Sequence, residues 1–594
     1  MSGLSVSKTI ESLLPRGTMH GGQEPYSWES FPIDPADAFG VAAILLERAG
    51  CYQYIPPNTC GFSCEAPDSG DPFEIAGANQ FELRLLATAW SYDYPFEPLT
   101  DDANAEAIAR KDENIQRAIE RFNWRFAEYP NDYLARARHE LPGITDEPFT
   151  TLWKRLISCQ EPVSTDYEAD SATRPQWWRD AIRLLILADE AAAGMGFITP
   201  PGKPETRWQE RAMTRLAQSD SFHLGLLIDP DVAGVLPKTR TPSVGCTPRS
   251  LSHNLCLAPA RGRVAVEWVP RLDPAPEADT DAFNVLLVPF PYVMRADWLE
   301  PSGQGTFKFR QKWLDGGVRN RLNLLVEQII KDSDKPPHAI VLPEFALDWD
   351  AFSKLAADIG QNHRSVEVLL AGISDYNGIE GNFVATWLRD KKSTFVRGKH
   401  HRWKIDKHQL ERYGMSGRLP GEGGWWEDIA LQRRAVQFFP LRNRSVFTTL
   451  ICEDLARIEP CQAIIRGVGP NLVFVLLMDG AQVASRWPNQ YAGVLAEDPG
   501  SSVLTLTSLG LLSRISAGHP AGRRSVALWR DQSTLTPIDL REGEIAALLS
   551  LEPKTVEEYS IDGRSDGGAA TTWRLASVVP IRQRVEQEWV YSTP

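Results

Sequence analysis

The sequence predicts an α/β protein whose first part is mostly α-helical, and two observations carry this prediction. Residues 1–230 contain apolar residues at helical spacing and no alternating strand pattern of comparable length. Within residues 283–590, short β-favouring apolar runs follow one another, and helical segments separate several of them. Residues 231–282 lie between these regions. They are rich in proline and acidic residues and contain one expected strand, so they indicate a domain boundary.

The expected helical domain, residues 1–230, has three segments with clear helix signals. Residues 34–49 begin with acidic residues and end near Arg48, which complements the helix dipole. Residues 103–127 carry an apolar stripe, and residues 174–193 have Pro175 where a helix can start. The residues leave the role of this domain open, and binding of a protein partner is one candidate role.

The expected strands of the second domain are continuous apolar runs rather than alternating ones. This pattern is typical of strands that are covered on both faces. The runs lie at residues 283–290, 338–345, 366–373, 382–388, 445–452, 472–478, 502–509 and 525–530.

Composition excludes several classes of protein. A net charge of −14 over 594 residues argues against a dominant nucleic-acid-binding surface. No apolar stretch is long enough to span a bilayer, and the first residues lack a secretory signal, so we expect a cytoplasmic protein. The eight cysteines are too sparse for a disulfide scaffold and lack the paired spacing of a zinc site. We therefore expect no metal and no cofactor.

The first candidate catalytic residue is Glu344, in the segment IVLPEFALD. An apolar strand ends in proline and places a carboxylate just beyond its tip. Taken alone, such a residue is more often an ordinary loop acid.

The second candidate is Lys407, in the segment WKIDKHQLERYG. Lys404 lies three residues earlier, one helical turn away if this segment is helical. The residues alone do not separate a functional lysine from a surface lysine, and the choice between Lys407 and Lys404 stays open.

The third candidate is Cys452, in the segment VFTTLICEDLAR. A β-branched apolar run ends at this cysteine, and the acidic residues Glu453 and Asp454 follow where a helix is expected to start. A sharp strand-to-helix turn exposes a nucleophile, and a helix N-terminus favours the thiolate. The alternative is a buried structural cysteine, while Cys461 lacks such a setting.

Taken together, these three segments resemble the motifs of the nitrilase superfamily of carbon–nitrogen hydrolases. LPEF is similar to the family's glutamate motif, LICEDLAR to its cysteine motif, and KHQLERYG to the lysine motif of glutaminase domains in NAD synthetases. The resemblance covers residues 283 to about 540. It implies a four-layer α-β-β-α sandwich that forms a homodimer or a larger homo-oligomer through this domain.

The resemblance also implies a thiol mechanism on a small-molecule amide. Glu344 is the expected general base, Cys452 the nucleophile, and Lys407 the residue that stabilises the oxyanion together with the backbone N–H of Glu453. Many members of the family have a second glutamate after the lysine. Glu411, Glu422 and Glu427 all compete for this supporting role, and the glycines around Glu422 favour that residue.

A narrower resemblance concerns residues 476–510. This segment is similar to nitrilase domains that accompany reverse transcriptases in bacterial antiviral defence. The alternative function is therefore a defence component in which the nitrilase-like domain acts as effector, sensor or oligomerisation scaffold beside such a partner.

Overall fold

In the computed structural model, the chain divides into two compact units. The first comprises Met1–Arg271, Gly467–Gly469 and Val556–Ala570, and the second comprises Leu272–Arg466, Pro470–Thr555 and Thr571–Pro594. The structure describes residues 4–14, 27–54, 78–92, 105–127, 131–164, 175–196, 206–217, 223–242, 245, 247–260, 264–269, 282–315, 317–421, 423–442, 445–515, 524–561, 564 and 569–584.

The first unit is mostly helical, as the sequence predicts. Its helix α2 starts as expected, because the Asp34 side chain accepts a hydrogen bond from Ala36 N and Pro35 occupies the first turn. Gly50 ends the same helix in the left-handed conformation. The α-helices are α1 (Val6–Leu13), α2 (Pro35–Ala49), α3 (Ala78–Trp90), α4 (Ala105–Arg125), α5 (Asn131–Glu140), α6 (Glu147–Ser158), α7 (Gln176–Ala191) and α8 (Arg207–Ala217).

Two short strands, β1 (Gly234–Pro237) and β2 (Leu255–Ala258), form an antiparallel pair in this unit. The expected strand near residue 265 is β3 (Ala265–Trp268). Buried Asp189 of α7 accepts hydrogen bonds from the backbone N–H groups of His253, Asn254 and Leu255. This carboxylate therefore fixes the start of β2 against helix α7.

The second unit contains two large sheets whose strands carry the expected apolar runs. The first sheet has the order β10 (Ser393–Gly398), β9 (Ile379–Leu388), β8 (Val368–Tyr376), β7 (Ala339–Val341), β4 (Phe283–Leu287), β19 (Glu544–Glu557) and β20 (Ala569–Arg582). The second includes, in order, β18 (Leu535–Asp539), β17 (Ser525–Arg530), β16 (Ser502–Leu506), β15 (Leu472–Leu476), β14 (Ser445–Ile451) and β13 (Ala435–Leu441).

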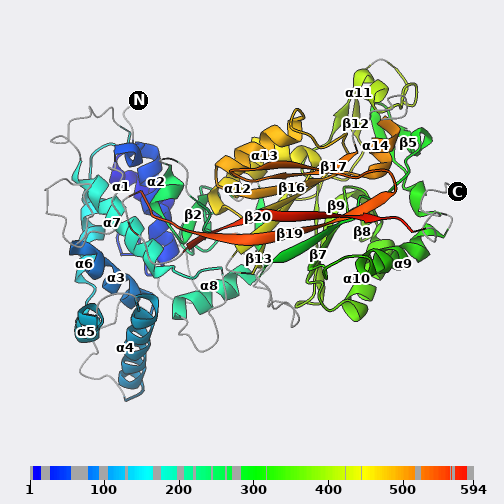
Figure 1. Ribbon diagram of the computed structural model, residues 1–594. Helices are drawn as coiled ribbons and strands as arrows, with labels where there is room; N and C mark the ends of the chain where they lie inside the picture. Colours follow the sequence, from blue (N-terminus) through cyan, green and yellow to red (C-terminus); the bar gives the residue numbers. More distant parts are fainter. Residues whose placement is uncertain are drawn as a thin grey trace. The chain divides into compact units, whose positions relative to one another are not determined.

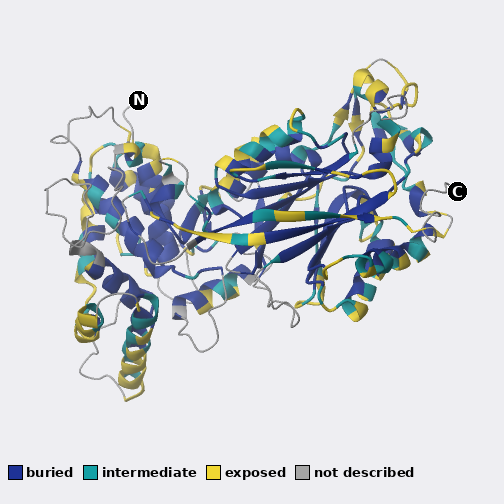
Figure 2. Cartoon of the chain, viewed as in Figure 1, coloured by how far each residue is buried: buried dark blue, intermediate teal, exposed yellow. Residues whose placement is uncertain are grey.

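The two sheets pack face to face, since β9 contacts β14 and β10 contacts β13. Helices α9 (Val318–Lys331) and α10 (Trp349–Asn362) pack together, and α10 contacts β8 of the first sheet. Helix α13 (Trp487–Glu497) contacts β16 and β17 of the second sheet. Figure 1 shows these four layers, and Figure 2 shows buried strands between helices with exposed outer faces. The fold is thus the predicted α-β-β-α sandwich.

Strand direction places the ends of several strands at one edge of each sheet. Strands β4, β7 and β8 run parallel, as do β14, β15 and β16. Segments that follow the carboxyl ends of such strands are where α/β proteins bind ligands. A small sheet of β11 (Lys404–Ile405), β12 (Trp425–Glu427), β6 (Thr306–Phe309) and β5 (Leu299–Gly303) completes this unit.

Among the helices of the described residues, none is both long and apolar enough to cross a membrane.

Candidate active site

Glu344 lies in a tight turn just after strand β7, and its side chain is 2% exposed. The next residue, Phe345, has a positive φ of 58°, a conformation that non-glycine residues rarely adopt. Gly372 of β8 lies against this turn. A Cβ atom on Gly372 would lie 2.5 Å from both Glu344 Cα and Phe345 N. The position of Glu344 therefore depends on a glycine in the neighbouring strand.

Gly372→Ala is expected to displace the Glu344 turn, because the added methyl group meets backbone atoms that cannot move aside cheaply. Gly360→Ala is the matched control, because a Cβ atom there would lie 3.3 Å from a Trp387 ring carbon. We expect Gly372→Ala to lose more amide-hydrolysis activity than Gly360→Ala. Activity and thermal unfolding of both variants check this. If the two variants were equally active, the close approach of Gly372 to the Glu344 turn would not determine the position of Glu344.

The buried lysine beside Glu344 is Lys399, which follows strand β10 directly. Its Nζ donates to Glu344 Oε1 at 3.0 Å and to Glu427 Oε2 at 2.7 Å. Its backbone N–H donates to Asn382 O at 2.8 Å. Burial opposes the charge on Lys399, but the two carboxylates outweigh it and raise its pKa well above the usual value. Lys399 is therefore a fixed cation.

Asn382 and Glu427 complete this buried cluster. Asn382, on β9, donates to Glu344 Oε1 at 2.7 Å and to Glu427 Oε1 at 2.8 Å. The backbone N–H of Trp403 donates to Glu427 Oε2 at 2.9 Å. Asn382 and Lys399 both donate to Glu344 Oε1, and Glu344 Oε2 is buried with no hydrogen-bond partner among the described residues. Burial raises the pKa of Glu344, against the charge of Lys399.

Cys452 follows β14 at the same edge, with a φ of 44° and 6% exposure. The negative charge of Glu344 raises the pKa of Cys452, and the positive charge of Lys399 lowers it. Strand β14 runs straight into the turn that carries Cys452, and the positive φ marks a strained elbow. Glu344, Lys399 and Cys452 thus each lie after the end of a strand, Glu344 and Lys399 form an ion pair, and both charges act on the Cys452 thiol.

The expectation that a helix N-terminus favours the Cys452 thiolate is wrong. Cys452 is the first residue of a 3-10 turn of only five residues, Cys452–Ala456, and α12 (Ala463–Val468) starts later. Burial, and then the negative charge of Glu344, raise the pKa of Cys452 well above its usual value. The resting cysteine is therefore a neutral thiol that needs a base.

The structure places both sequence-predicted lysines outside this buried cluster. Lys407 is exposed at the start of α11 (Lys407–Arg412), and Lys404 is exposed on β11. The lysine that pairs with Glu344 is Lys399, which directly follows β10. Lys404 and Lys407 lie farther along the chain and are exposed. The available signal was position: Lys399 directly follows strand β10, as Cys452 follows β14, although Arg397 interrupts the apolar run before Lys399. The motif KHQLERYG favoured Lys407, which lies in helix α11.

Among the competing glutamates, the structure favours Glu427. Glu411 is exposed, and Glu422 lies outside the described residues. Glu427 is 3% exposed and shares Lys399 with Glu344. Glu453 is half-buried and pairs with Arg457 at 2.9 Å, so its side chain has a partner other than the cluster.

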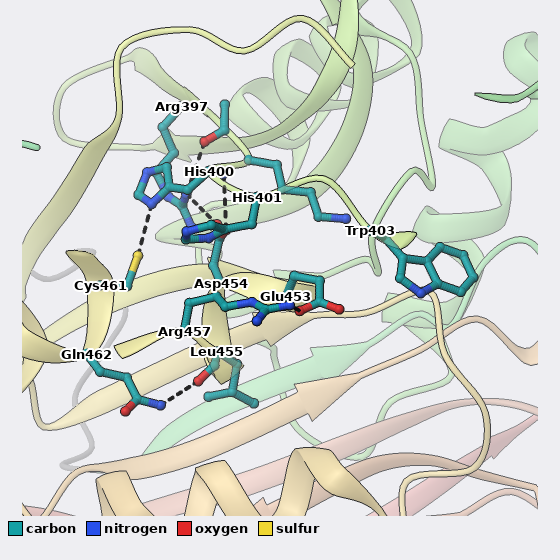
Figure 3. Close-up of polar contacts among 12 residues, drawn as sticks. Arg397, His400, His401, Trp403, Glu453, Asp454, Leu455, Arg457, Cys461 and Gln462 are labelled. Atoms are coloured by element: carbon teal, nitrogen blue, oxygen red, sulfur yellow. Dashed lines mark hydrogen bonds and ion pairs between the residues drawn. The ribbon is translucent and has the colours of Figure 1, made fainter. Parts of the chain in front are cut away.

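A second buried network, drawn in Figure 3, joins the segments that carry Lys399 and Cys452. Asp454 accepts hydrogen bonds from His400 N at 3.0 Å and from Arg397 Nη1 at 3.2 Å. His401 Nδ1 lies 3.3 Å from the same carboxylate. Burial opposes the charge on Asp454, but His400, His401 and Arg397 outweigh it and hold its pKa well below the usual range. Asp454 therefore ties the residue after Lys399 to the Cys452 elbow.

His400, Asp454 and Cys461 could in principle hold a metal ion, since their ligand atoms all lie within 4.8 Å of one another. Their contacts argue against this use. Arg397 already supplies the positive charge beside Asp454. His400 Nδ1 lies 3.0 Å from Cys461 Sγ, and burial lowers the pKa of His400 to about 4 and raises the pKa of Cys461. The neutral His400 imidazole and the neutral Cys461 thiol therefore form a hydrogen bond with each other.

Cys452 lies in the wall of a cavity of about 520 Å³, a volume that suits a small organic molecule. The cavity wall combines aromatic, charged and apolar side chains. It is lined by Trp403, Gln409, Arg412, Tyr413, Cys452, Glu453, Ala456, Arg457, Met478, Asp479, Ser485, Arg486, Trp487 and Tyr491.

No protein-family model and no curated protein matches the sequence. Among solved structures, the chain is similar to a glutamine-dependent NAD+ synthetase from Acinetobacter baumannii, with 14% identity, a TM-score of 0.28, and coverage of 45% of each chain. The match therefore spans less than half of that synthetase.

Two further similar structures are covered over most of their length. Nit3 of Saccharomyces cerevisiae, a member of branch 10 of the nitrilase superfamily, has 13% identity and a TM-score of 0.28, with 45% of this chain and 89% of that chain covered. An amidase from Nesterenkonia sp. has 11% identity and a TM-score of 0.26, with 52% and 96% covered. Because these TM-scores are low, the functional conclusion rests on the geometry of the site.

Proposed function

We propose that this protein is a cysteine-dependent hydrolase of amide carbon–nitrogen bonds, with Cys452 as nucleophile, Glu344 as general base and Lys399 as oxyanion-stabilising residue. The observation that carries the proposal is the contact of Glu344 and Lys399 beside a neutral Cys452 thiol at the wall of a cavity. Glu344 Oε2, which has no partner among the described residues, is the oxygen available to take the thiol proton.

The first half of the reaction forms a thioester. As the Cys452 sulfur attacks the amide carbon, its proton moves to Glu344, and the carbonyl oxygen becomes an oxyanion next to Lys399 Nζ. Glu344 then gives that proton to the amide nitrogen, the carbon–nitrogen bond breaks, and ammonia or an amine leaves.

The second half releases the acid. Glu344 takes a proton from water, the resulting hydroxide attacks the thioester carbon, and the carbon–sulfur bond breaks. The Cys452 sulfur recovers its proton from Glu344, and the carboxylic acid product leaves. Every proton therefore passes through one carboxylate, which Asn382 and Lys399 hold by its other oxygen.

Glu427 and Asn382 act through Lys399 and Glu344 rather than on the substrate. Glu427 places a second negative charge on Lys399, so the lysine stays protonated when Glu344 is neutral. Asn382 bridges the two carboxylates and keeps them at a fixed separation.

The proposal is tested by intact mass spectrometry and ammonia release with a library of primary amides. We expect wild-type protein to release ammonia and to accumulate, on rapid acid quench, a species heavier by the mass of the acyl group. Cys452→Ala should show neither, whereas Cys461→Ser, a change at another buried cysteine, should retain the adduct. Ammonia release that persists in Cys452→Ala would overturn the proposal.

The alternative role in antiviral defence rests on the resemblance of residues 476–510 and stays a prediction. A phage-challenge assay of cells carrying wild-type or Cys452→Ala protein tests it. Protection by both proteins would favour a scaffold or sensor, and protection by wild type alone would favour an effector that uses the same cysteine.

A further inference from the structure

Asp479 is a buried carboxylate in the wall of the Cys452 cavity that the proposed reaction does not use. It follows the end of strand β15 and is 3% exposed. Asp479 and Cys452 line the same cavity. The negative charge of Asp479 contributes to raising the pKa of Cys452, after burial and the charge of Glu344, whereas the charge of Lys399 lowers that pKa. The Asp479 carboxylate therefore acts on the substrate groups that lie next to the amide bond at Cys452.

Within the described part of the chain, Oδ1 of Asp479 has hydrogen-bond partners and Oδ2 has none. Oδ1 accepts a hydrogen bond from Tyr413 Oη at 2.7 Å and pairs with Arg486. Oδ2 is buried and has no hydrogen-bond partner among the described residues. A buried carboxylate oxygen without a donor is costly, so a ligand that supplies an N–H group there gains a charge-assisted hydrogen bond.

Two of the three arginines that line the cavity have anionic partners, and Arg412 is the third. Arg486 pairs with Asp479 itself, and Arg457 pairs with Glu453 at 2.9 Å. A substrate carboxylate would have to compete with these carboxylates for the two arginines. The part of the wall that Asp479 forms therefore favours a hydrogen-bond donor over an anion.

Aromatic side chains supply the rest of the wall. Trp403 packs edge-on against Tyr413, with ring centroids 5.8 Å apart, and Trp487 packs similarly against Tyr491 at 6.2 Å. Aromatic faces attract cations and bind planar or apolar groups. Such a wall suits a substrate with an apolar or aromatic body and a positively charged nitrogen.

We propose that Asp479 determines substrate specificity, and that the preferred substrates are primary amides whose acyl part carries an amine next to the amide. The ammonium group donates to Asp479 Oδ2 while the scissile carbonyl lies at Cys452, and an apolar side group packs on the aromatic wall. The reaction in this inference rests on the proposed function, whereas the substrate selectivity rests on the Asp479 side chain.

Two probes that differ only at the proposed contact test this inference. Phenylalaninamide carries an α-ammonium group, and 3-phenylpropanamide has the same skeleton without it. We expect wild-type protein to prefer phenylalaninamide by roughly 10- to 100-fold in kcat/KM, as a charge-assisted hydrogen bond implies. Asp479→Asn should remove most of this preference, and Glu453→Gln, a change at the other carboxylate of the cavity, should keep the ratio.

Direct binding to the Cys452→Ala protein, measured by calorimetry, separates this inference from the proposed reaction. A lower Kd for phenylalaninamide without turnover by wild type would overturn the proposed reaction and support the role of Asp479. Equal binding of the two amides, a preference for 3-phenylpropanamide, or no binding of phenylalaninamide would overturn the role of Asp479. The wild-type ratio needs no variant, so misfolding of Asp479→Asn does not remove the test.

Discussion

Replacing Lys399 with methionine is expected to lower kcat/KM for amide hydrolysis by about 100- to 1000-fold, the loss typical for removal of one oxyanion donor. Lys407→Met is the matched control, and we expect its kcat/KM to stay within about twofold of wild type, as for most surface changes. The pair compares a buried lysine between two carboxylates with an exposed lysine eight residues later. Steady-state ammonia release from the same amide measures both.

The Lys399→Met protein should also be less stable, because Glu344 and Glu427 would share a buried site without their counter-charge. Breaking a buried ion pair typically lowers the free energy of unfolding by about 3–5 kcal/mol. Denaturant unfolding of the two variants measures this loss, and an activity assay well below the unfolding transition separates it from the catalytic loss. If Lys407→Met lost activity and Lys399→Met did not, the assignment made from the sequence would be restored.

Much of the sandwich could be predicted from the sequence because its strands are apolar along their whole length. The runs that contain β14 and β15 are buried at every position, which removes the alternation of a half-exposed strand and leaves a continuous pattern. The long strands β19 and β20 were missed, because charged residues in the second half of β19 interrupt its apolar run. An exposed half of a strand resembles a loop in sequence.

The candidate site was predicted only in part, for a physical reason. Glu344 and Cys452 stand at the ends of apolar strands, so the sequence marks them directly. The strand before Lys399 carries Arg397, whose charge is neutralised by Asp454 from a distant segment. Asn382 and Glu427 belong to the cluster through contacts between strands that are remote in sequence. Only the folded chain brings such partners together.

Glu344→Gln is expected to lower kcat/KM by about 100- to 10,000-fold, the range for loss of a general acid–base group. Glutamine keeps the size of the side chain but cannot take the proton of a thiol whose pKa is raised well above its usual value. Glu411→Gln, at an exposed glutamate, is the matched control. A loss of less than about tenfold in Glu344→Gln would show that another group takes the proton.

The pH profile separates a base from a merely structural carboxylate. Burial raises the pKa of Glu344 above 4.5, and the group must be ionised to accept the Cys452 proton. Wild-type kcat/KM should therefore fall as the pH is lowered through this raised pKa, while the protein is still folded by circular dichroism. In Glu344→Gln this acidic limb should disappear from the residual activity. If the limb persisted, the titrating group would be a different carboxylate of the site, and Glu344 would only position Lys399.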